Sequence, residues 1–310
     1  MKVLVAGATG AVGIPLVRAL TAAGHQVTGI SRTTAASELL QSLGAGAVEA
    51  DALDREALMR AVDGRTFGAV IHELTALKKA PARFRDMSAT NELRERGTAN
   101  LLEAARVTGA TRMLTQSIVF GYGYYDHGGE PLTETSPFGQ LHQDKFDPSI
   151  AAMASTENQL FTARGIDGIA LRYGLFYGRD LDSMVGMLRK RRLPVTDSSA
   201  TLALVHHDDA AAATMAALEK GTADTAYNIV DDTPTTWRDF ITTVATNFQT
   251  PRPLSMKGWM VRLAAPYAGR MMTQVSMNVS NGRARAQLGW IPRYPSCVDG
   301  IRAAASRVNS

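Results

Sequence analysis

The sequence contains little cysteine and no long apolar segment. Cys297 is the only cysteine among the 310 residues, so no disulfide can form within the chain. A chain without disulfides suits a reducing compartment. No stretch approaches the roughly 18 uninterrupted apolar residues that a membrane-spanning helix needs. We therefore expect a cytoplasmic protein that does not contact a membrane.

A large excess of one charge is absent as well. The chain has 33 basic and 29 acidic residues, a net charge of +4, and its one dense basic run is Arg189-Lys190-Arg191-Arg192. On a helix these side chains point in different directions, so we interpret the run as a solvated helix end rather than a surface for nucleic acid. We expect a small-molecule substrate and no nucleic-acid partner.

A metal-binding cluster is also missing. The nearest candidate is His206-His207-Asp208-Asp209, but consecutive residues of a strand face opposite sides, so four in a row do not converge on one ion. We therefore predict no metal site. Instead, Asp208 or Asp209 is expected to cap a helix over residues 210–219.

The first 120 residues alternate short apolar runs with helical patterns, which is typical of a doubly wound parallel α/β sheet. The predicted strands are 2–6, 26–30, 47–50, 67–71, a strand that starts at 112, and 168–172. The predicted helices include 35–43, 54–62, 91–108 and 150–163, and Asp54 is expected to cap the helix that runs to Val62. We expect a Rossmann-type domain over residues 1–172, to which 203–230 return. Residues 173–202 and 231–310 are expected to form a smaller substrate-binding region.

The sharpest motif is Gly7-Ala8-Thr9-Gly10-Ala11-Val12-Gly13, which follows the first predicted strand and opens the first predicted helix. In this position Gly7 makes the tight turn, Gly10 lets the backbone approach a pyrophosphate, and Gly13 lets helix and strand pack closely. The helix N-terminus offers unpaired N–H groups and a positive dipole end to the phosphates. The motif predicts a bound dinucleotide.

The residues that end the second predicted strand indicate which dinucleotide is bound. NAD-binding proteins carry a carboxylate there for the ribose hydroxyls, whereas this chain reads Gly29-Ile30-Ser31-Arg32-Thr33. Arg32 suits a 2′-phosphate, so NADP is favoured over NAD; the alternative is that Arg32 is an ordinary surface arginine. After the third strand, Asp51 either accepts the adenine amino group, with Leu53 packed on the ring, or caps the next helix.

With these residues placed, the chain resembles the extended and atypical branches of the short-chain dehydrogenase/reductase superfamily, of the NAD-dependent epimerase/dehydratase kind. The resemblance covers nearly the whole chain. It is carried by the glycine motif, Asp51-Ala52-Leu53-Asp54, Asn91 with Gly97-Thr98-Ala99-Asn100-Leu101-Leu102, Leu171-Arg172-Tyr173-Gly174-Leu175-Phe176-Tyr177-Gly178, His206-His207-Asp208-Asp209-Ala210 and Tyr227-Asn228-Ile229.

The resemblance implies a set of cofactor contacts and a mode of assembly. Together with the motifs above, it predicts contacts to NADP from Gly7, Thr9, Gly10, Ala11, Val12, Gly13, Ser31, Arg32, Asp51, Ala52, Leu53 and Tyr173. It also suggests a homodimer through the helices over 91–108 and 150–163.

The catalytic pair of the family is missing. Members of the family carry a Tyr and, four residues later, a Lys that lowers the tyrosine pKa. None of the eight tyrosines here has Lys four residues on. Aligning Glu157 with the family's glutamate on the same helix places Ser149 and Met153 at the two positions. A serine hydroxyl is far too weak an acid for this role, and methionine has no proton to exchange.

Other residues are therefore candidates for catalysis. Counting back from Phe120-Gly121, Gln116 takes the place of the family's serine, and a register shift would bring in Ser117 instead. In the Gly- and Tyr-rich loop over 121–148, Tyr122 and Tyr124 are further candidates, because loops at the carboxyl ends of strands lie over the ligand. A solvated loop is the alternative.

These observations predict an NAD(P)-binding oxidoreductase or epimerase-like enzyme with a non-standard catalytic set, acting on a small carbonyl or hydroxyl metabolite. Two alternatives remain open. The first is a non-redox enzyme on the same fold, such as an isomerase, cyclase or lyase. The second is an NADP-binding sensor or regulatory protein.

Overall fold

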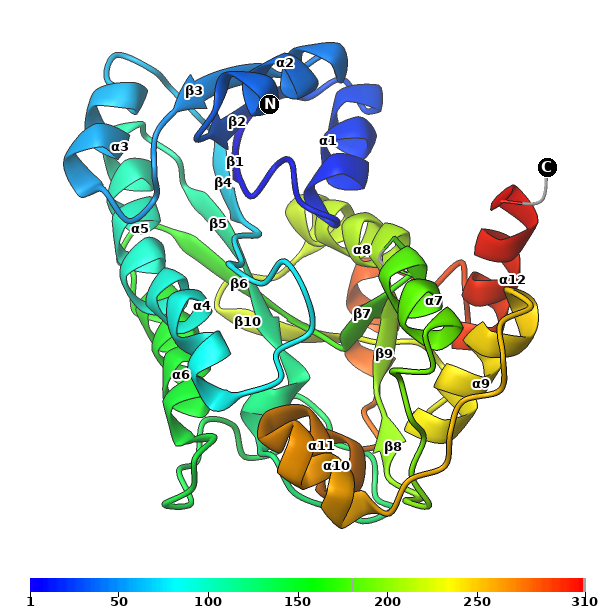
Figure 1. Ribbon diagram of the computed structural model, residues 1–310. Helices are drawn as coiled ribbons and strands as arrows, with labels where there is room; N and C mark the ends of the chain where they lie inside the picture. The colour runs from blue at the N-terminus through cyan, green and yellow to red at the C-terminus, as the bar shows by residue number, and fades with distance from the viewer. Residues whose placement is uncertain (180, 309–310) are drawn as a thin grey trace.

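A parallel seven-stranded sheet lies at the centre of the described chain, residues 1–179 and 181–308 of this computed structural model (Figure 1). Its strands are β1 (Lys2–Ala6), β2 (Gln26–Ser31), β3 (Gly46–Glu49), β4 (Ala69–His72), β5 (Arg112–Ile118), β6 (Asp167–Tyr173) and β10 (Thr225–Ile229). Their order is β10-β6-β5-β4-β1-β2-β3, and neighbours pair in parallel. The order reverses between β1 and β4, which is where such sheets bind a ligand. The predicted Rossmann-type doubly wound sheet is confirmed.

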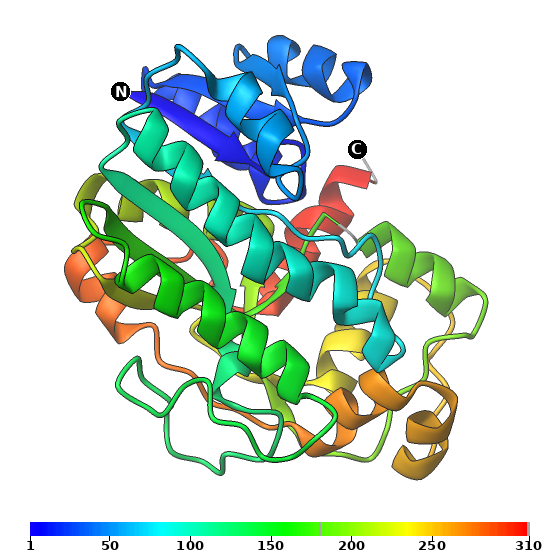
Figure 2. The same ribbon diagram turned by 90° about the vertical axis from the view of Figure 1, so that its left-hand side faces the viewer.

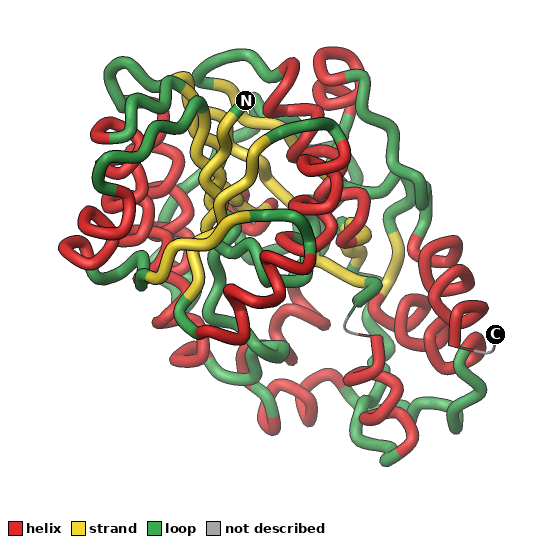
Figure 3. The backbone as a smooth tube through the Cα atoms, turned by 90° about the horizontal axis from the view of Figure 1, so that it is seen from above, coloured by secondary structure: helices red, strands yellow, loops and turns green. Residues whose placement is uncertain are grey.

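Helices cover both faces of this sheet (Figure 3). One face packs against α1 (Gly13–Ala22), α2 (Thr34–Ser42) and α8 (His207–Lys220), through an apolar cluster that includes Leu16, Leu40 and Ala213. The other face packs against α3 (Arg55–Val62), α5 (Thr98–Val107) and α6 (Asp147–Phe161), through Leu58, Leu101 and Leu160. The strands are therefore buried on both sides, which explains why they read as continuous apolar runs.

The helix predicted over 91–108 is a run of three segments. It consists of α4 (Ser88–Glu92), the π-helical turn η2 (Leu93–Gly97) and α5. This run and α6 lie side by side on the outside of the sheet (Figure 2). In a π turn the backbone hydrogen bonds join residues five apart instead of four, so the turn holds one extra residue. Such turns often occur at functional sites.

A second region lies below the central sheet and to its right in Figure 1. Its elements are β7 (Leu175–Tyr177), α7 (Leu181–Arg189), β8 (Thr201–Leu202), β9 (Leu204–His206), β11 (Thr235–Thr236), α9 (Trp237–Asn247), α10 (Gly258–Ala264), α11 (Pro266–Gln274) and α12 (Cys297–Val308). Three further single turns are η1 (Phe84–Met87), η3 (Val119–Tyr122) and η4 (Ala284–Leu288). Two further apolar clusters lie here. One, around Tyr124, Phe146 and Tyr267, also includes Ile150 and Met153 of α6, and the other lies around Phe240 and Ile301.

The expected cap of the helix over 210–219 is wrong. The helix begins at His207, directly after β9, and its N-cap is His206, whose Nδ1 accepts the Asp208 N–H at 3.1 Å. Asp209 instead accepts the N–H groups of Arg293 and Tyr294. The sequence pattern missed this because a carboxylate three residues inside a helix looks the same as a cap until the helix start is known.

One expectation about the surface, the solvated basic run, agrees with the structure. The run from Arg189 to Arg192 is exposed at the end of α7. Within residues 1–179 and 181–308, no helix is both long and apolar enough to cross a membrane. Over the same residues, no group of three or more His, Cys, Asp or Glu side chains is placed to hold a metal ion.

Candidate functional site

The glycine-rich loop has the close contacts that its sequence predicts. Gly7 has φ +87°, and a Cβ there would lie 2.4 Å from the Glu73 carbonyl oxygen. A Cβ on Gly13 would lie 2.1 Å from the Gly7 carbonyl oxygen, so α1 packs directly on the turn. Gly10 differs, because its added Cβ would meet only that same oxygen, at 3.1 Å. Gly10 thus presents open backbone at the surface, as a pyrophosphate requires.

The N-terminus of α1 is left uncapped behind this loop. Its N-cap residue is Val12, whose side chain makes no capping hydrogen bond. The loop is closed internally by the Gly10 N–H, which donates to the Gly7 carbonyl at 2.9 Å. Thr9 is half-buried and Ala11 exposed. Uncapped N–H groups beside an open glycine fit the phosphates of a dinucleotide.

The end of β2 places one cation beside one acid. The Arg32 side chain is 72% exposed, and its Nη1 lies 3.7 Å from Asp51 Oδ2. Ser31 is buried, and its hydroxyl pairs with that of Ser37 at 2.7 Å. Since Arg32 is so exposed, its ion pair with Asp51 is weak and leaves the guanidinium available to a ligand.

Asp51 does not cap the helix that follows. The N-cap of α3 is Asp54, whose carboxylate accepts the Ala57 N–H at 2.9 Å. Asp51 accepts the Leu53 N–H in a tight turn at the end of β3, where Ala52 is buried and Leu53 half-buried. The capping interpretation of Asp51 is therefore wrong.

A buried carboxyl group, which the sequence analysis missed, belongs to Glu73, whose backbone lies against the turn at Gly7. Glu73 follows β4 and is 6% exposed. The Tyr173 hydroxyl donates to Glu73 Oε1 at 2.8 Å and lies 2.6 Å from the Thr214 hydroxyl. Burial raises the pKa of Glu73 to about 8, although its hydrogen bonds with the hydroxyls of Tyr173 and Thr214 lower it. Tyr173, expected at the cofactor, is fully buried in the core.

Gln116 and Ser117 lie on opposite sides of β5, since side chains alternate along a strand. Gln116 is half-buried at the carboxyl end of the sheet, and its amide donates to the Leu74 carbonyl after β4. Ser117 is buried and donates to Glu157 Oε1 of α6 at 2.7 Å. Only Gln116 therefore lies beside the reversal of strand order.

Tyr122 belongs to the same buried network as Ser117. Arg172 forms a paired contact with Glu157, at 2.9 and 2.7 Å, and also donates to the Tyr122 hydroxyl at 2.9 Å. The Tyr122 hydroxyl donates onward to Asn228 Oδ1 at 2.8 Å. Burial raises the pKa of Tyr122 despite the nearby Arg172. The network joins β5, β6, α6 and β10.

Tyr124 lies in a separate aromatic cluster. Its ring stacks on Phe146 with centroids 3.9 Å apart, and its hydroxyl lies 3.2 Å from that of Tyr267 on α11. Burial raises the pKa of Tyr124 and also that of Tyr267. These phenols therefore hold their protons more tightly than free tyrosine does.

Ser149 and Met153, which the sequence analysis assigns to the positions of the family's Tyr/Lys pair, face the interior from α6. Ser149 is 4% exposed and Met153 is fully buried. The Asn91 side-chain amide donates to the Ser149 hydroxyl at 3.3 Å. Neither side chain can serve as an acid near neutral pH.

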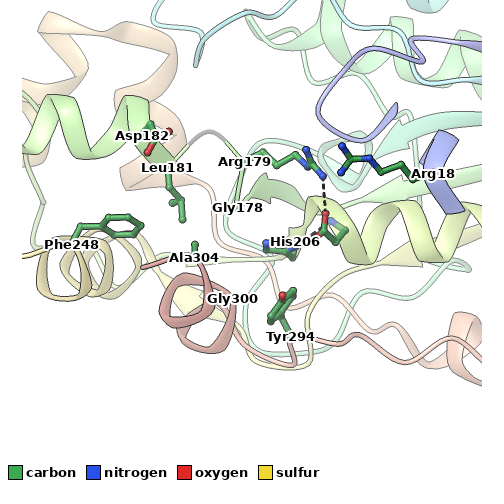
Figure 4. A pocket seen from close by; sticks show the side chains of 11 residues that line it. Arg18, Gly178, Arg179, Leu181, Asp182, His206, Phe248, Tyr294, Gly300 and Ala304 are labelled. Carbon is green, nitrogen blue, oxygen red and sulfur yellow. Dashed lines mark hydrogen bonds and ion pairs between the residues drawn. The ribbon is translucent and has the colours of Figure 1, made fainter. Parts of the chain in front are cut away.

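A separate hollow of about 360 Å³ lies beside α1, α7 and α12 (Figure 4). Arg179 and Arg18 extend into it from opposite sides, and Arg179 lies 3.5 Å from Asp208. None of the residues expected at the cofactor or at the reacting groups lines this hollow. We therefore place the candidate site at the carboxyl ends of β1, β4 and β5 instead.

Comparisons with known proteins agree with this geometry. Residues 3–230 match the NAD dependent epimerase/dehydratase family, which confirms the resemblance that the motifs indicate. A 3-diazoavenalumate denitrifying reductase of a Streptomyces species is 36% identical over 97% of this chain and 99% of its own. A 2-alkyl-3-oxoalkanoate reductase of Stenotrophomonas maltophilia is 29% identical over 81% of this chain and 77% of its own.

The fold also matches solved structures. The UDP-glucose 4-epimerase of Thermus thermophilus, in complex with NAD, superposes with a TM-score of 0.79 at 24% identity, over 100% of this chain and 99% of that one. At this level of identity the similarity establishes the fold alone.

Proposed function

We propose that this chain, which belongs to the NAD dependent epimerase/dehydratase family, is an NADPH-dependent reductase whose acceptor needs no proton from a Tyr/Lys pair. The observation that carries the proposal is a contrast within one site. The glycine-rich loop keeps the open Gly10 and the uncapped helix that a dinucleotide needs. By contrast, no tyrosine of the chain has a lysine four residues on, and the alignment through Glu157 assigns Ser149 and Met153 to the two positions of the pair.

The cofactor would be held at both of its ends by residues described above. The first turn of α1, with Thr9 and Gly10, fits the pyrophosphate, and exposed Arg32 fits a 2′-phosphate. Asp51 would accept the adenine amino group, with Ala52 and Leu53 against the ring. Tyr173 would support the loop through Glu73 rather than touch the cofactor, since it is fully buried. Bound NADPH supplies a hydride.

The side chains of the site are better suited to orienting an acceptor than to donating a proton to it. Ser117 and Tyr122 are committed to the buried network with Glu157 and Arg172. Burial raises the pKa of Tyr124, so this phenol releases a proton less readily than free tyrosine. Gln116 can donate a hydrogen bond to an acceptor but cannot titrate. The site therefore suits an acceptor whose reduction leaves no alkoxide to be protonated.

A diazo compound has this property. The relative at 36% identity is named as a denitrifying reductase of a diazo compound. When hydride adds to the carbon of an arenediazonium ion, a C–H bond forms and the C–N bond breaks. The electron pair of the broken bond leaves with neutral N₂, and NADPH becomes NADP⁺. Because the leaving group is a neutral gas, the step needs no general acid.

Carbonyl reduction is the second candidate. It is favoured by the relative named as a 2-alkyl-3-oxoalkanoate reductase. That chemistry would need a proton from Tyr124 or a bound water, with Gln116 donating a hydrogen bond to the carbonyl oxygen.

Stopped-flow oxidation of NADPH separates these functions. The acceptors are 4-diazophenolate and 4-hydroxybenzaldehyde, N₂ release is followed by mass spectrometry, and Gly10→Val serves as the control for uncatalysed reduction. Enzyme-dependent N₂ release with matching NADPH loss supports the proposal. Turnover of the aldehyde alone would favour the second candidate. Tight NADPH binding without turnover of either acceptor would favour a non-redox enzyme or a sensor.

A further inference from the structure

Arg94 is a buried cation without a counter-ion. It lies in the π-helical turn η2 and is 7% exposed. Its one hydrogen bond from the side chain is a long contact from Nη1 to Asn91 Oδ1, at 3.4 Å, and its Nε is buried without a partner among the described residues. Across residues 1–179 and 181–308, no carboxylate lies within ion-pair distance of it. Burying a guanidinium without a partner costs free energy, and a bound anion would offset that cost.

The groups that face Arg94 carry no negative charge. Tyr124, from the loop after β5, and Tyr267, from α11, are its phenol neighbours, and His72 of β4 is the third titratable group close to it. Burial, together with the charge of Arg94, lowers the pKa of His72 to about 4. Burial raises the pKa of both phenols. Near neutral pH the guanidinium therefore faces three neutral groups.

The location of Arg94 connects it with the candidate site. Asn91, which contacts Arg94, also donates to Ser149, at the position where the family has its tyrosine. His72 ends β4 at the reversal of strand order. Arg94 thus lies at the substrate end of the site rather than at the adenosine end, where Arg32 lies.

We propose that Arg94, with the hydroxyls of Tyr124 and Tyr267, binds a carboxylate of the substrate. This inference rests on the proposed function and specifies its substrate class as an aromatic or unsaturated carboxylic acid. A guanidinium offers two parallel N–H donors that match a carboxylate. The phenols are 3.2 Å apart and can donate to the same anion. The rings of Phe84, Phe146 and Tyr267 form the apolar wall beside them.

A carboxylate fits better than a phosphate, which carries more charge. The other guanidinium at this aromatic cluster, Arg270, lies over the Phe146 ring but forms two hydrogen bonds with Asp144, at 3.0 and 2.6 Å. Arg94 is therefore the one unpaired positive charge that the described part of the cluster offers. A single charge with flat aromatic surroundings suits a planar monoanion.

Calorimetric titration with a matched pair of probes tests the inference. Cinnamate and its neutral isostere cinnamamide are titrated into wild type, Arg94→Met and Arg96→Met, each with and without NADP⁺, and phenyl phosphate is titrated into wild type for comparison. Arg96 is the control because it lies two residues on but is exposed and paired with Glu92. We expect wild type and Arg96→Met to prefer cinnamate by about tenfold or more, and Arg94→Met to lose the preference.

Thermal unfolding distinguishes a binding role of Arg94 from a structural one, because loss of a structural residue would lower Tm. Removing an unpaired buried charge should leave Tm unchanged or raise it by a few degrees, because Met fills the space without the desolvation cost. If Arg94→Met does not fold, Arg94→Lys is used instead. It keeps the positive charge but lacks the two parallel N–H donors of a guanidinium, so it should still weaken cinnamate binding about tenfold.

Several outcomes would overturn the inference. These are equal binding of the two probes by wild type, binding of neither, stronger binding of phenyl phosphate than of cinnamate, or an unchanged preference in Arg94→Met. A loss of NADP⁺ affinity in Arg94→Met would assign the arginine to the cofactor instead. Failure of wild type to bind NADPH would contradict the proposed function, while the titrations without NADP⁺ would still report on Arg94.

Discussion

Replacing Glu73 by Gln tests whether the carboxyl group beneath the glycine-rich loop is protonated in the folded protein. Burial raises the pKa of Glu73 from 4.5 to about 8. The folded state therefore binds this proton more tightly than the unfolded chain does. The resulting stabilisation is complete below about pH 4.5 and is lost as the pH rises through about 8. The difference in pKa corresponds to a loss on the order of 5 kcal/mol once both states are ionised.

Urea unfolding followed by circular dichroism, at about pH 5, 7 and 9, measures this loss. Glu73→Gln keeps an acceptor for the Tyr173 hydroxyl but has no proton to lose, so it should match wild type near pH 5 and be several kcal/mol more stable near pH 9. Asp231, whose pKa is also raised by burial to about 8, is present in both proteins and cancels in the difference. Parallel dependence of the two stabilities on pH would refute the argument.

The remaining predictions concern the cofactor and the reacting groups. Gly10→Val should abolish NADPH binding in calorimetry, because the side chain would occupy the space through which the backbone approaches the pyrophosphate. Its Tm should change little, because the added Cβ meets only one backbone oxygen, at 3.1 Å. Gly13→Ala should destabilise the fold by about 1–3 kcal/mol, because its Cβ would lie 2.1 Å from backbone. Arg32→Ala should weaken NADPH binding about tenfold and leave NADH binding unchanged. In turnover assays, Ser149→Ala should change the rate less than about threefold, whereas Gln116→Ala should lower it about tenfold.

Features that depend on local pattern could be predicted from the sequence. The apolar strands, the loop from Gly7 to Gly13 and the N-cap Asp54 are short-range, since each is decided by residues within about one turn or strand of one another. The predicted strand over 67–71 forms as Ala69–His72, and the predicted helix over 150–163 forms as Asp147–Phe161. Boundaries shift by a few residues because packing decides where each element ends.

Features that depend on tertiary contact could not be predicted. Glu73, Arg94 and Tyr267 look like ordinary surface or core residues in the sequence, and only tertiary packing shows that all three are buried ionisable groups. The partner of Ser117 is Glu157, forty residues away along the chain. No pattern in the sequence distinguishes that contact from an open catalytic serine.

The central claim is that this chain transfers a hydride to its acceptor without a proton from a Tyr/Lys pair. The most direct test is single-turnover reduction of 4-diazophenolate in two labelled arms. One arm uses NADPH with both C4 hydrogens replaced by deuterium in H₂O, and the other uses unlabelled NADPH in H₂O and in D₂O. The account predicts deuterium from the cofactor at the carbon that loses N₂, and a solvent isotope effect close to one. A solvent isotope effect of about two or more, or incorporation of deuterium at that carbon from D₂O, would contradict it.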